Sequence, residues 1–343
     1  MMDADISSQN ITILSRALHC MGRIAGSVII EVTSAGILWR VLNDSQSSYA
    51  SLQLSASFFR RFDHGSYNSI KCRLPVRNLL WSLRPRMNAH VKDSNVSMRL
   101  DADGLSFEFS NVHGFEQKLY ICSDDIPGSI YSHNCDKRSM PNALSASAKW
   151  LHKTLDAFHP LLKEITFQAL PNELIIRSYV DDTAFDDPNI LQTEVRLLAD
   201  DFELYRVAES SSCASVITVK DLKSVLAFCE SVSINMHMFF SVAGDPILLS
   251  SADLNDCSDQ WVFNVAISTF ASEDGLSNEE NIVTPEVPAT FLTNQTSVKQ
   301  VRQVDKPSKS SSTASMSQTE SEMSEDDVPG TPPPPQLKRV RSS

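Results

Sequence analysis

The chain has 343 residues, of which 42% are hydrophobic, and its 42 acidic against 30 basic side chains give a formal net charge of −12. Such an acidic total argues against a protein that binds DNA or RNA over its whole surface, because phosphate affinity comes mainly from lysine and arginine. The N-terminus has acidic residues and no apolar run, and no stretch approaches about 18 consecutive apolar residues. We therefore expect neither a secretory signal nor a membrane span.

The first half of the chain is expected to contain two helices surrounded by strands. Apolar residues at helical spacing predict one helix over residues 12–22 and another over 76–84, which Pro85 would end. Alternating apolar residues predict a hairpin over residues 95–110, with Asp-Ala-Asp-Gly as its turn.

The second half shows the same plan. A third helix is expected within residues 145–160, with a serine as N-cap and Pro160 beyond its end. A fourth is expected over about 219–231, where one face carries Leu222, Val225, Leu226 and Cys229. The segments ELIIRSY, SVITV, SINMHMFF and WVFNVAIS are typical of strands.

The spacing of the four helices indicates an internal repeat. The first and third helices lie about 135 residues apart, and the second and fourth about 145 residues apart. Two tandem copies of one domain fit this spacing. We therefore expect an α+β fold in which helices cover one face of antiparallel sheets.

The composition changes sharply near residue 271, after which the chain has no Cys and no Trp. Ten of the seventeen residues from Ser308 to Ser324 are Ser or Thr. Because such a segment buries too little apolar surface to offset its ordering entropy, we expect residues 272–343 to be disordered.

Cysteine usage favours a reducing compartment. The seven cysteines are scattered, odd in number and without a CxxC pair, which is typical of free thiols in a cytosolic or nuclear protein. His133 and Cys135 stand two apart without a second ligand pair at zinc spacing, so we expect no metal site.

Basic residues recur beside the apolar stripes of all four expected helices. On one helix alone they would be ordinary solvent-facing charge. Their recurrence on four helices of an acidic chain indicates a surface for a polyanion. The candidates are Arg16, Arg23, Arg77, Arg84, Lys149, Lys153, Lys220 and Lys223.

In this layout of helices and strands the chain resembles the sliding-clamp family typified by PCNA. Within that family it is most similar to the Rad-nine subunit of the 9-1-1 checkpoint clamp. The segments that carry the resemblance are ALHCMGRI (17–24), SSYASLQLSASFFRRF (47–62), ELIIRSY (173–179), LKSVLAFCESVSINMHMFFSVAGDPILLS (222–250) and VPGTPPP (328–334).

The resemblance implies two clamp domains, over residues 1–122 and 148–271, joined by a connector over 123–147. Their helices would line the hole of a ring and their sheets would form its outer shell. Edge strands near 105–122 and in ELIIRSY would make the subunit contacts. In clamps of this kind the connector borders a groove where partner peptides dock, and the spacing of residues does not identify the ones that line it here.

The resemblance also implies partners and a non-enzymatic role without a cofactor. The partners would be subunits of the Rad-one and Hus-one types, a clamp loader, double-stranded DNA at recessed ends and a BRCT-domain checkpoint activator. The last would bind the phosphorylated tail, and the protein would act in the nucleus.

Short motifs in the tail fit this role. Ser317 precedes Gln, Thr319 and Ser324 have an acidic residue three positions on, and Thr331 precedes Pro, which suits three kinds of kinase. Near the C-terminus, the basic residues of a short nuclear-import candidate are Lys338, Arg339 and Arg341.

Two other functions are compatible with single features of the sequence. One is a homotrimeric replication clamp. The other is a metal-dependent nuclease, suggested by the run Tyr179-Val180-Asp181-Asp182. The nuclease is disfavoured because two-metal catalysis also needs another carboxylate and a nucleotide pocket, whereas these aspartates lead into TAFDDP, a run suited to a solvated loop.

Overall fold

The computed structural model describes residues that fall within one compact unit, Met1–Ile282. They are residues 1–65, 70–83, 95–101, 103–110, 116–124, 136–179, 192–208, 213–254 and 260–271. The segment 272–343, with all its predicted phosphorylation and nuclear-import residues, lies outside the described residues, as does Arg84.

Four α-helices lie in the described residues: α1 (Ser8–Ile24), α2 (Val76–Leu83), α3 (Ala148–Leu155) and α4 (Val219–Val232). They match the four predicted helices in position, with bounds that differ by a few residues. Helix α1 begins earlier because the Ser7 hydroxyl accepts a hydrogen bond from the Asn10 backbone N–H at 3.1 Å. Helix α3 ends five residues before Pro160, and Phe158 reaches the core from the turn that follows.

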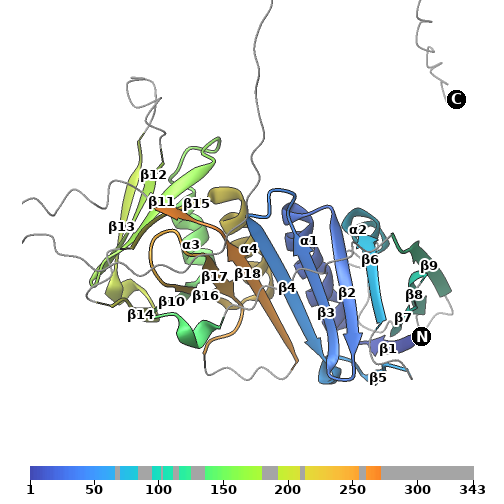
Figure 1. Ribbon diagram of the computed structural model, residues 1–343. Helices are drawn as coiled ribbons and strands as arrows, with labels where there is room; N and C mark the ends of the chain where they lie inside the picture. Colours follow the sequence, from blue (N-terminus) through green and yellow to red (C-terminus); the bar gives the residue numbers. More distant parts are fainter. Residues whose placement is uncertain are drawn as a thin grey trace, which may run out of the picture. The chain divides into compact units, whose positions relative to one another are not determined.

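The strands form three antiparallel sheets (Figure 1). One five-stranded sheet has the order β5 (Arg61–Asp63), β1 (Met2–Ile6), β7 (Asn95–Leu100), β8 (Gly104–Ser110) and β9 (Glu116–Cys122). The other has the order β13 (Glu194–Leu198), β12 (Glu173–Ser178), β11 (Glu164–Ala169), β15 (Cys213–Thr218) and β19 (Phe270–Ala271). The predicted hairpin over 95–110 is therefore β7 and β8, and its turn is closed by the Asp101 N–H, which donates to the Gly104 carbonyl at 3.1 Å.

The third sheet is central and has nine strands. Its order is β14 (Leu204–Arg206), β10 (Asn142–Ser147), β16 (Asn235–Phe240), β17 (Ile247–Ser250), β18 (Trp261–Ile267), β4 (Ser48–Ser55), β3 (Gly36–Leu42), β2 (Ser27–Thr33) and β6 (Ile70–Pro75). The two halves of the chain meet where β18 pairs with β4, in a register that joins Trp261 to Leu54 and Ile267 to Ser48. One hydrophobic core extends through both halves.

The two halves repeat one order of elements. Each has a strand, a helix, five strands, a second helix and three strands, running from β1 to β9 and from β10 to β18. This confirms the tandem arrangement predicted from the helix spacing. The bounds of the two domains and of the connector stay a prediction. Strand β10 lies at the end of the predicted connector, 123–147, and pairs with β16.

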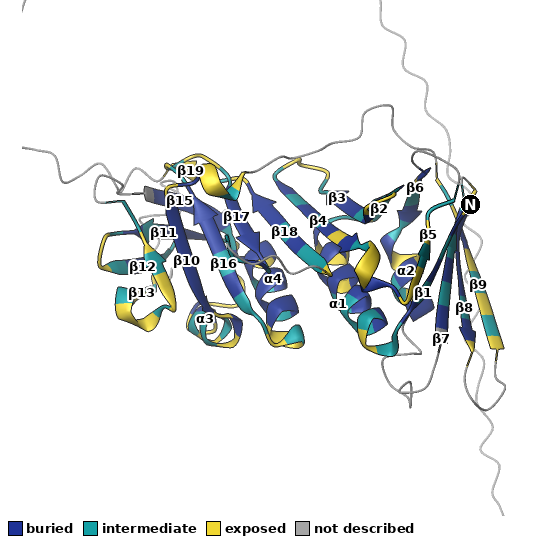
Figure 2. Cartoon of the chain, turned by 90° about the horizontal axis from the view of Figure 1, so that it is seen from below, coloured by how far each residue is buried: buried dark blue, intermediate teal, exposed yellow. Residues whose placement is uncertain are grey.

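The helices form a row. Helix α1 packs against both α2 and α4, and α3 packs against α4, so the order is α2, α1, α4, α3. Figure 2 shows this row running along the sheets, with buried residues on its inner side. The predicted layering of helices on one face of the sheets is therefore confirmed.

Candidate nucleic-acid interface

The row of helices carries an uneven set of charges. Within α1–α4 the acidic residues are Asp221 and Glu230, whereas seven residues are lysine or arginine. A chain with a net charge of −12 thus has a strong basic excess in this one layer. The seven are Arg16, Arg23, Arg77, Lys149, Lys153, Lys220 and Lys223.

Both acidic side chains are already engaged. The buried Asp221 carboxylate accepts hydrogen bonds from the Ser48 hydroxyl at 2.5 Å and from the Thr218 hydroxyl at 3.0 Å. The Glu230 carboxylate lies 3.0 Å from His152 Nδ1, which joins α4 to α3. The Asp221 carboxylate is thus buried in an internal contact, while the Glu230 carboxylate is exposed and paired with a histidine of the neighbouring helix.

The buried side of α4 explains how its lysines are held. Leu222, Val225, Leu226 and Cys229 are all buried, as their spacing predicted. Burial raises the pKa of the Cys229 thiol to about 12, so this thiol stays protonated and packs as a small apolar group. The helix is thereby fixed to the sheet, and Lys220 on its other side is exposed.

The predicted DNA-facing residues fall into three groups. Five of them are exposed on the helices: Arg23, Arg77, Lys149, Lys153 and Lys220. Two are half-buried and occupied. The Arg16 guanidinium donates to the Ser231 carbonyl at the end of α4, and Lys223 Nζ lies 3.8 Å from Asp156 Oδ1. The last, Arg84, lies outside the described residues.

Arg16 therefore stabilises the packing of α1 on α4, a role that its position in the sequence did not predict. Its partner lies 215 residues away, where α4 ends. A cation at the C-terminal end of a helix is also favoured by the helix dipole. Arg16 joins α1 to α4 and is a poorer candidate for DNA contact than the five exposed residues.

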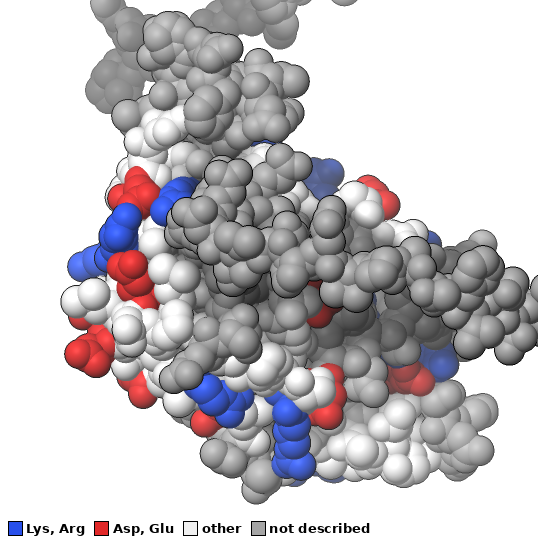
Figure 3. Space-filling model, turned by 60° about the vertical axis from the view of Figure 1, so that its left-hand side comes forward, with Lys and Arg blue, Asp and Glu red and all other residues white. Residues whose placement is uncertain are grey.

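The outer side of the second half has a different character. Figure 3 turns toward the viewer the side that carries β12 and β13 in Figure 1, and basic and acidic side chains are interspersed there. Arg177 and Arg196, for example, both bind the Glu194 carboxylate, at 2.6 and 2.7 Å. These two hydrogen bonds hold the pKa of Glu194 below its ordinary value. Interspersed pairs of this kind do not favour a polyanion.

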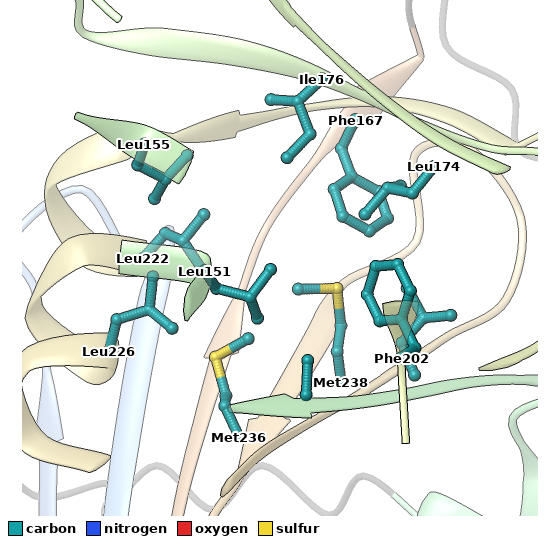
Figure 4. Close-up of a pocket in the computed structure, with 12 residues that line it drawn as sticks. Leu151, Leu155, Phe167, Leu174, Ile176, Phe202, Leu222, Leu226, Met236 and Met238 are labelled. Carbon is teal, nitrogen blue, oxygen red and sulfur yellow. The ribbon is translucent and has the colours of Figure 1, made fainter. Parts of the chain in front are cut away.

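A cavity in the second half offers no site for a polar ligand. It has a volume of about 20 Å³ and is lined by apolar side chains, among them Leu151, Leu222 and Met236 (Figure 4). Such a space holds about one water molecule, and an apolar lining leaves that water without hydrogen-bond partners. It is a packing gap between α3, α4 and the sheets.

A metal site and a membrane-spanning helix have no support among the described residues. Among them, no group of three or more His, Cys, Asp and Glu residues could hold a metal ion, and no helix has the length and apolar character to cross a membrane. Asp181 and Asp182 of the nuclease alternative lie outside the described residues, as do His133 and Cys135.

The prediction for the edge strands is partly wrong. ELIIRSY forms β12, which pairs on one side with β11 and on the other with β13. The edges of that sheet are β13 and β19, and those of the first five-stranded sheet are β5 and β9. The two edges that bear on the prediction are β13 and β9, the latter from the end of the predicted 105–122 region. Each edge exposes a large side chain, Tyr120 on β9 and Leu198 on β13.

One exposed residue was missed. The Trp81 side chain on α2 is 66% exposed, although tryptophan is usually well buried. The sequence did hold the signal, because residue 81 falls outside the stripe of Val76, Leu79, Leu80 and Leu83 that α2 packs inward.

Comparison with known proteins shows which family the chain resembles. The model of the Rad9 family matches residues 14–266. The cell cycle checkpoint control protein Rad9 of Drosophila melanogaster is 20% identical over 250 residues, which are 72% of this chain and 53% of that protein. The DNA repair protein rad9 of Schizosaccharomyces pombe is 20% identical over 312 residues, which are 81% of this chain and 73% of that protein. The chain thus spans about half the length of the fly relative, and 65% of its Schizosaccharomyces octosporus counterpart.

Solved structures with the same arrangement are sliding clamps. PCNA from Thermococcus kodakaraensis has a TM-score of 0.61 at 13% identity, covering 78% of this chain and all of that one. A chain of the PCNA2–PCNA3 complex from Sulfolobus tokodaii has a TM-score of 0.60, also at 13% identity, and covers 78% of this chain and 98% of that one. The fold is therefore the PCNA-like sliding-clamp fold. Because the family model matches well over half of its length, this chain belongs to the Rad9 family.

Proposed function

We propose that this protein is a non-enzymatic subunit of a heterotrimeric ring that encircles double-stranded DNA in the nucleus and serves the DNA-damage checkpoint. The observation that supports it most is the row of four helices, whose exposed charge is mainly basic in an otherwise acidic chain with a sliding-clamp fold. The row faces the hole of the ring, and the sheets form the outside.

The physical demands on such a row are modest. A closed ring is held on DNA by topology, so its inner surface needs cations that offset phosphate repulsion without reading bases. Lysine and arginine on flexible side chains meet this need. Net acidity of the whole chain is no obstacle, because the outer surface does not touch the duplex.

Subunit contacts are assigned to the two edge strands. Strand β9 of this chain pairs with one neighbour and β13 with the other, the two neighbours being of the Rad-one and Hus-one types. An unpaired sheet edge readily accepts another strand, and closing both edges also removes an aggregation hazard. A dedicated clamp loader places the ring at recessed DNA ends.

The tail carries the signalling role of the proposal. Phosphates on Ser317, Thr319, Ser324 or Thr331 each add about −1.5 to −2 charges, which a BRCT-domain checkpoint activator binds through basic side chains. Lys338, Arg339 and Arg341 serve nuclear import. Mass spectrometry of the protein from DNA-damaged cells should find phosphate between residues 308 and 331, and its absence there contradicts the signalling role.

The central test reverses the charge of the helix row. Replacing Lys149, Lys153, Lys220 and Lys223 with Glu should weaken retention of circular duplex DNA by the assembled ring. It should also lower the salt dependence of binding by about 0.9 in log–log slope per lost phosphate contact. The control variant carries Lys71→Glu and Arg138→Glu, two exposed cations outside α1–α4. It should retain DNA normally.

Assembly must be measured beside retention. If the four-lysine variant no longer co-purifies with the two partner subunits, the lysines have a structural role and the assignment to DNA is overturned. Normal assembly with normal retention overturns it as well.

The alternatives give different outcomes. A homotrimeric replication clamp, purified alone, would elute at three times the monomer mass, whereas we expect a monomer. A nuclease would cleave DNA in the presence of a divalent metal ion and lose that activity on Asp181→Ala and Asp182→Ala.

A further inference from the structure

Trp81 stands at the rim of an open hollow between α1 and α2. The hollow has a volume of about 520 Å³. Its lining comes from the last turns of α1 and the residues after it, and from one side of α2. The residues that matter below are His19, Gly22, Gly26, Arg77, Leu80 and Trp81. The two helices lie next to each other at one end of the row (Figure 2).

Two glycines shape the hollow. A Cβ atom at Gly22 would lie 3.0 Å from Val76 Cγ1 and 3.2 Å from Leu80 Cδ1, so the missing side chain lets α2 approach α1 closely. A Cβ atom at Gly26 would meet nothing within 4 Å. The helices are therefore in contact at Gly22, and the space opens beside Gly26.

The chemistry of the lining points to a nucleic acid. None of the described residues that line the hollow is acidic. Arg77 and His19 are exposed, and Trp81 is 66% exposed. An aromatic ring beside a guanidinium group is the usual means of holding single-stranded nucleic acid, since the ring stacks on a base and the cation offsets the phosphate.

The duplex itself is a poor occupant. Its bases are stacked on one another and offer only their edges in the grooves. An unpaired base has a free face, and stacking is tolerant of sequence because every base has a π-face. We propose that this hollow takes an unpaired base of single-stranded DNA that adjoins the encircled duplex, with Trp81 stacking on the base and Arg77 at its phosphate.

This inference rests on the proposed function, because the hollow belongs to the face that the ring turns toward DNA. It adds a second mode of contact at one place in the row: a base held by stacking, where the lysines supply only diffuse charge.

The test uses tryptophan fluorescence of the full-length chain titrated with an oligothymidylate. Of the four tryptophans, Trp39 is fully buried and Trp150 and Trp261 are half-buried, so Trp81 is the ring most open to quenching. Trp81→Ala should abolish most of the quenching and weaken binding by about 5- to 150-fold, the range for loss of one stacked base. Binding by the variants that lack Trp81 is followed by the fluorescence anisotropy of a labelled oligothymidylate. In that assay Trp81→Phe should keep binding within a few-fold, because phenylalanine also stacks. Phe270→Ala, which removes a partly exposed ring on β19, is the matched control and should bind normally.

A second measurement separates this inference from the proposed function. The assembled ring with Trp81→Ala should retain fully double-stranded circular DNA as the unchanged ring does, while losing its preference for duplex with a single-stranded tail. No quenching of the unchanged chain by oligothymidylate overturns the inference, whatever the ring does with duplex. Loss of a partner subunit on Trp81→Ala also overturns it and makes the hollow a protein contact. Failure of the four-lysine test, with oligothymidylate quenching intact, overturns the encircling function alone.

Discussion

The buried hydrogen bond between Ser48 and Asp221 is a sensitive point of the fold, because it ties the start of α4 to a strand of the other half. Ser48→Ala removes the 2.5 Å donor to the Asp221 carboxylate and leaves the Thr218 hydroxyl as its remaining side-chain donor in the described structure. Asp221 is only 7% exposed, so water cannot easily replace the lost donor. A hydrogen bond to a charged group contributes about 1.5–3 kcal/mol, and we expect this loss in the free energy of unfolding.

Urea denaturation of the full-length chain, followed by circular dichroism, measures this loss directly. In a thermal scan Ser48→Ala should lower the melting temperature by ~3–12 °C, because each kcal/mol lost corresponds to about 2–4 °C for a folded region of this size. Ser45→Ala is the matched control, because that hydroxyl is exposed and, in the part of the chain that the structure describes, its hydrogen bond is to the Ser47 hydroxyl, at 2.8 Å. In an Asp221→Ala background, Ser48→Ala should cost much less. A change below about 0.5 kcal/mol, or the same cost in both backgrounds, refutes the reasoning.

Two further changes follow from the described contacts. Gly104→Ala places a Cβ atom 2.2 Å from the Ile121 carbonyl oxygen, so β9 must shift away from β8. We expect the free energy of unfolding to fall by about 1–3 kcal/mol and co-purification with one partner to weaken. Gly26→Ala is the control and should change neither, because its Cβ atom meets nothing within 4 Å. Unfolding free energy should fall as pH rises from about 9 to about 12, because the buried Cys229 thiol keeps its proton up to about 12 whereas the unfolded chain releases it near 9. Cys229→Ala should remove about 1.4 kcal/mol per pH unit of that slope in urea titrations, and equal slopes for both proteins contradict the assignment.

Local patterns in the sequence predicted most of the helices and strands of the fold. The stripe of Leu222, Val225, Leu226 and Cys229 predicted α4 to within one residue, since burial of one face decides a helix. Alternation predicted β18, whose Phe263, Val265 and Ile267 are buried. These features depend on neighbours within a few residues.

What the sequence left open depends on distant partners. ELIIRSY has the composition of a strand, yet its place inside a sheet is set by β13, a separate strand later in the chain that pairs Glu173 with Leu198 and Arg177 with Glu194. Likewise nothing near Arg16 or Lys223 indicates that Ser231 and Asp156 occupy them. The candidate site was therefore predictable as a set of helices, while the division between exposed and occupied cations required the packing of one helix on another.

The join between β18 and β4 has a consequence for how the proposed ring admits DNA. Within the chain, seven residues of β18 pair with seven of β4, and the hydrogen bond between Ser48 and Asp221 links the two halves further. A join between chains through β13 has five residues to offer. Because the weaker joint yields first, loading should separate this subunit from its neighbour at β13 and leave the pairing of β18 with β4 intact, so that both halves of the chain move onto DNA together.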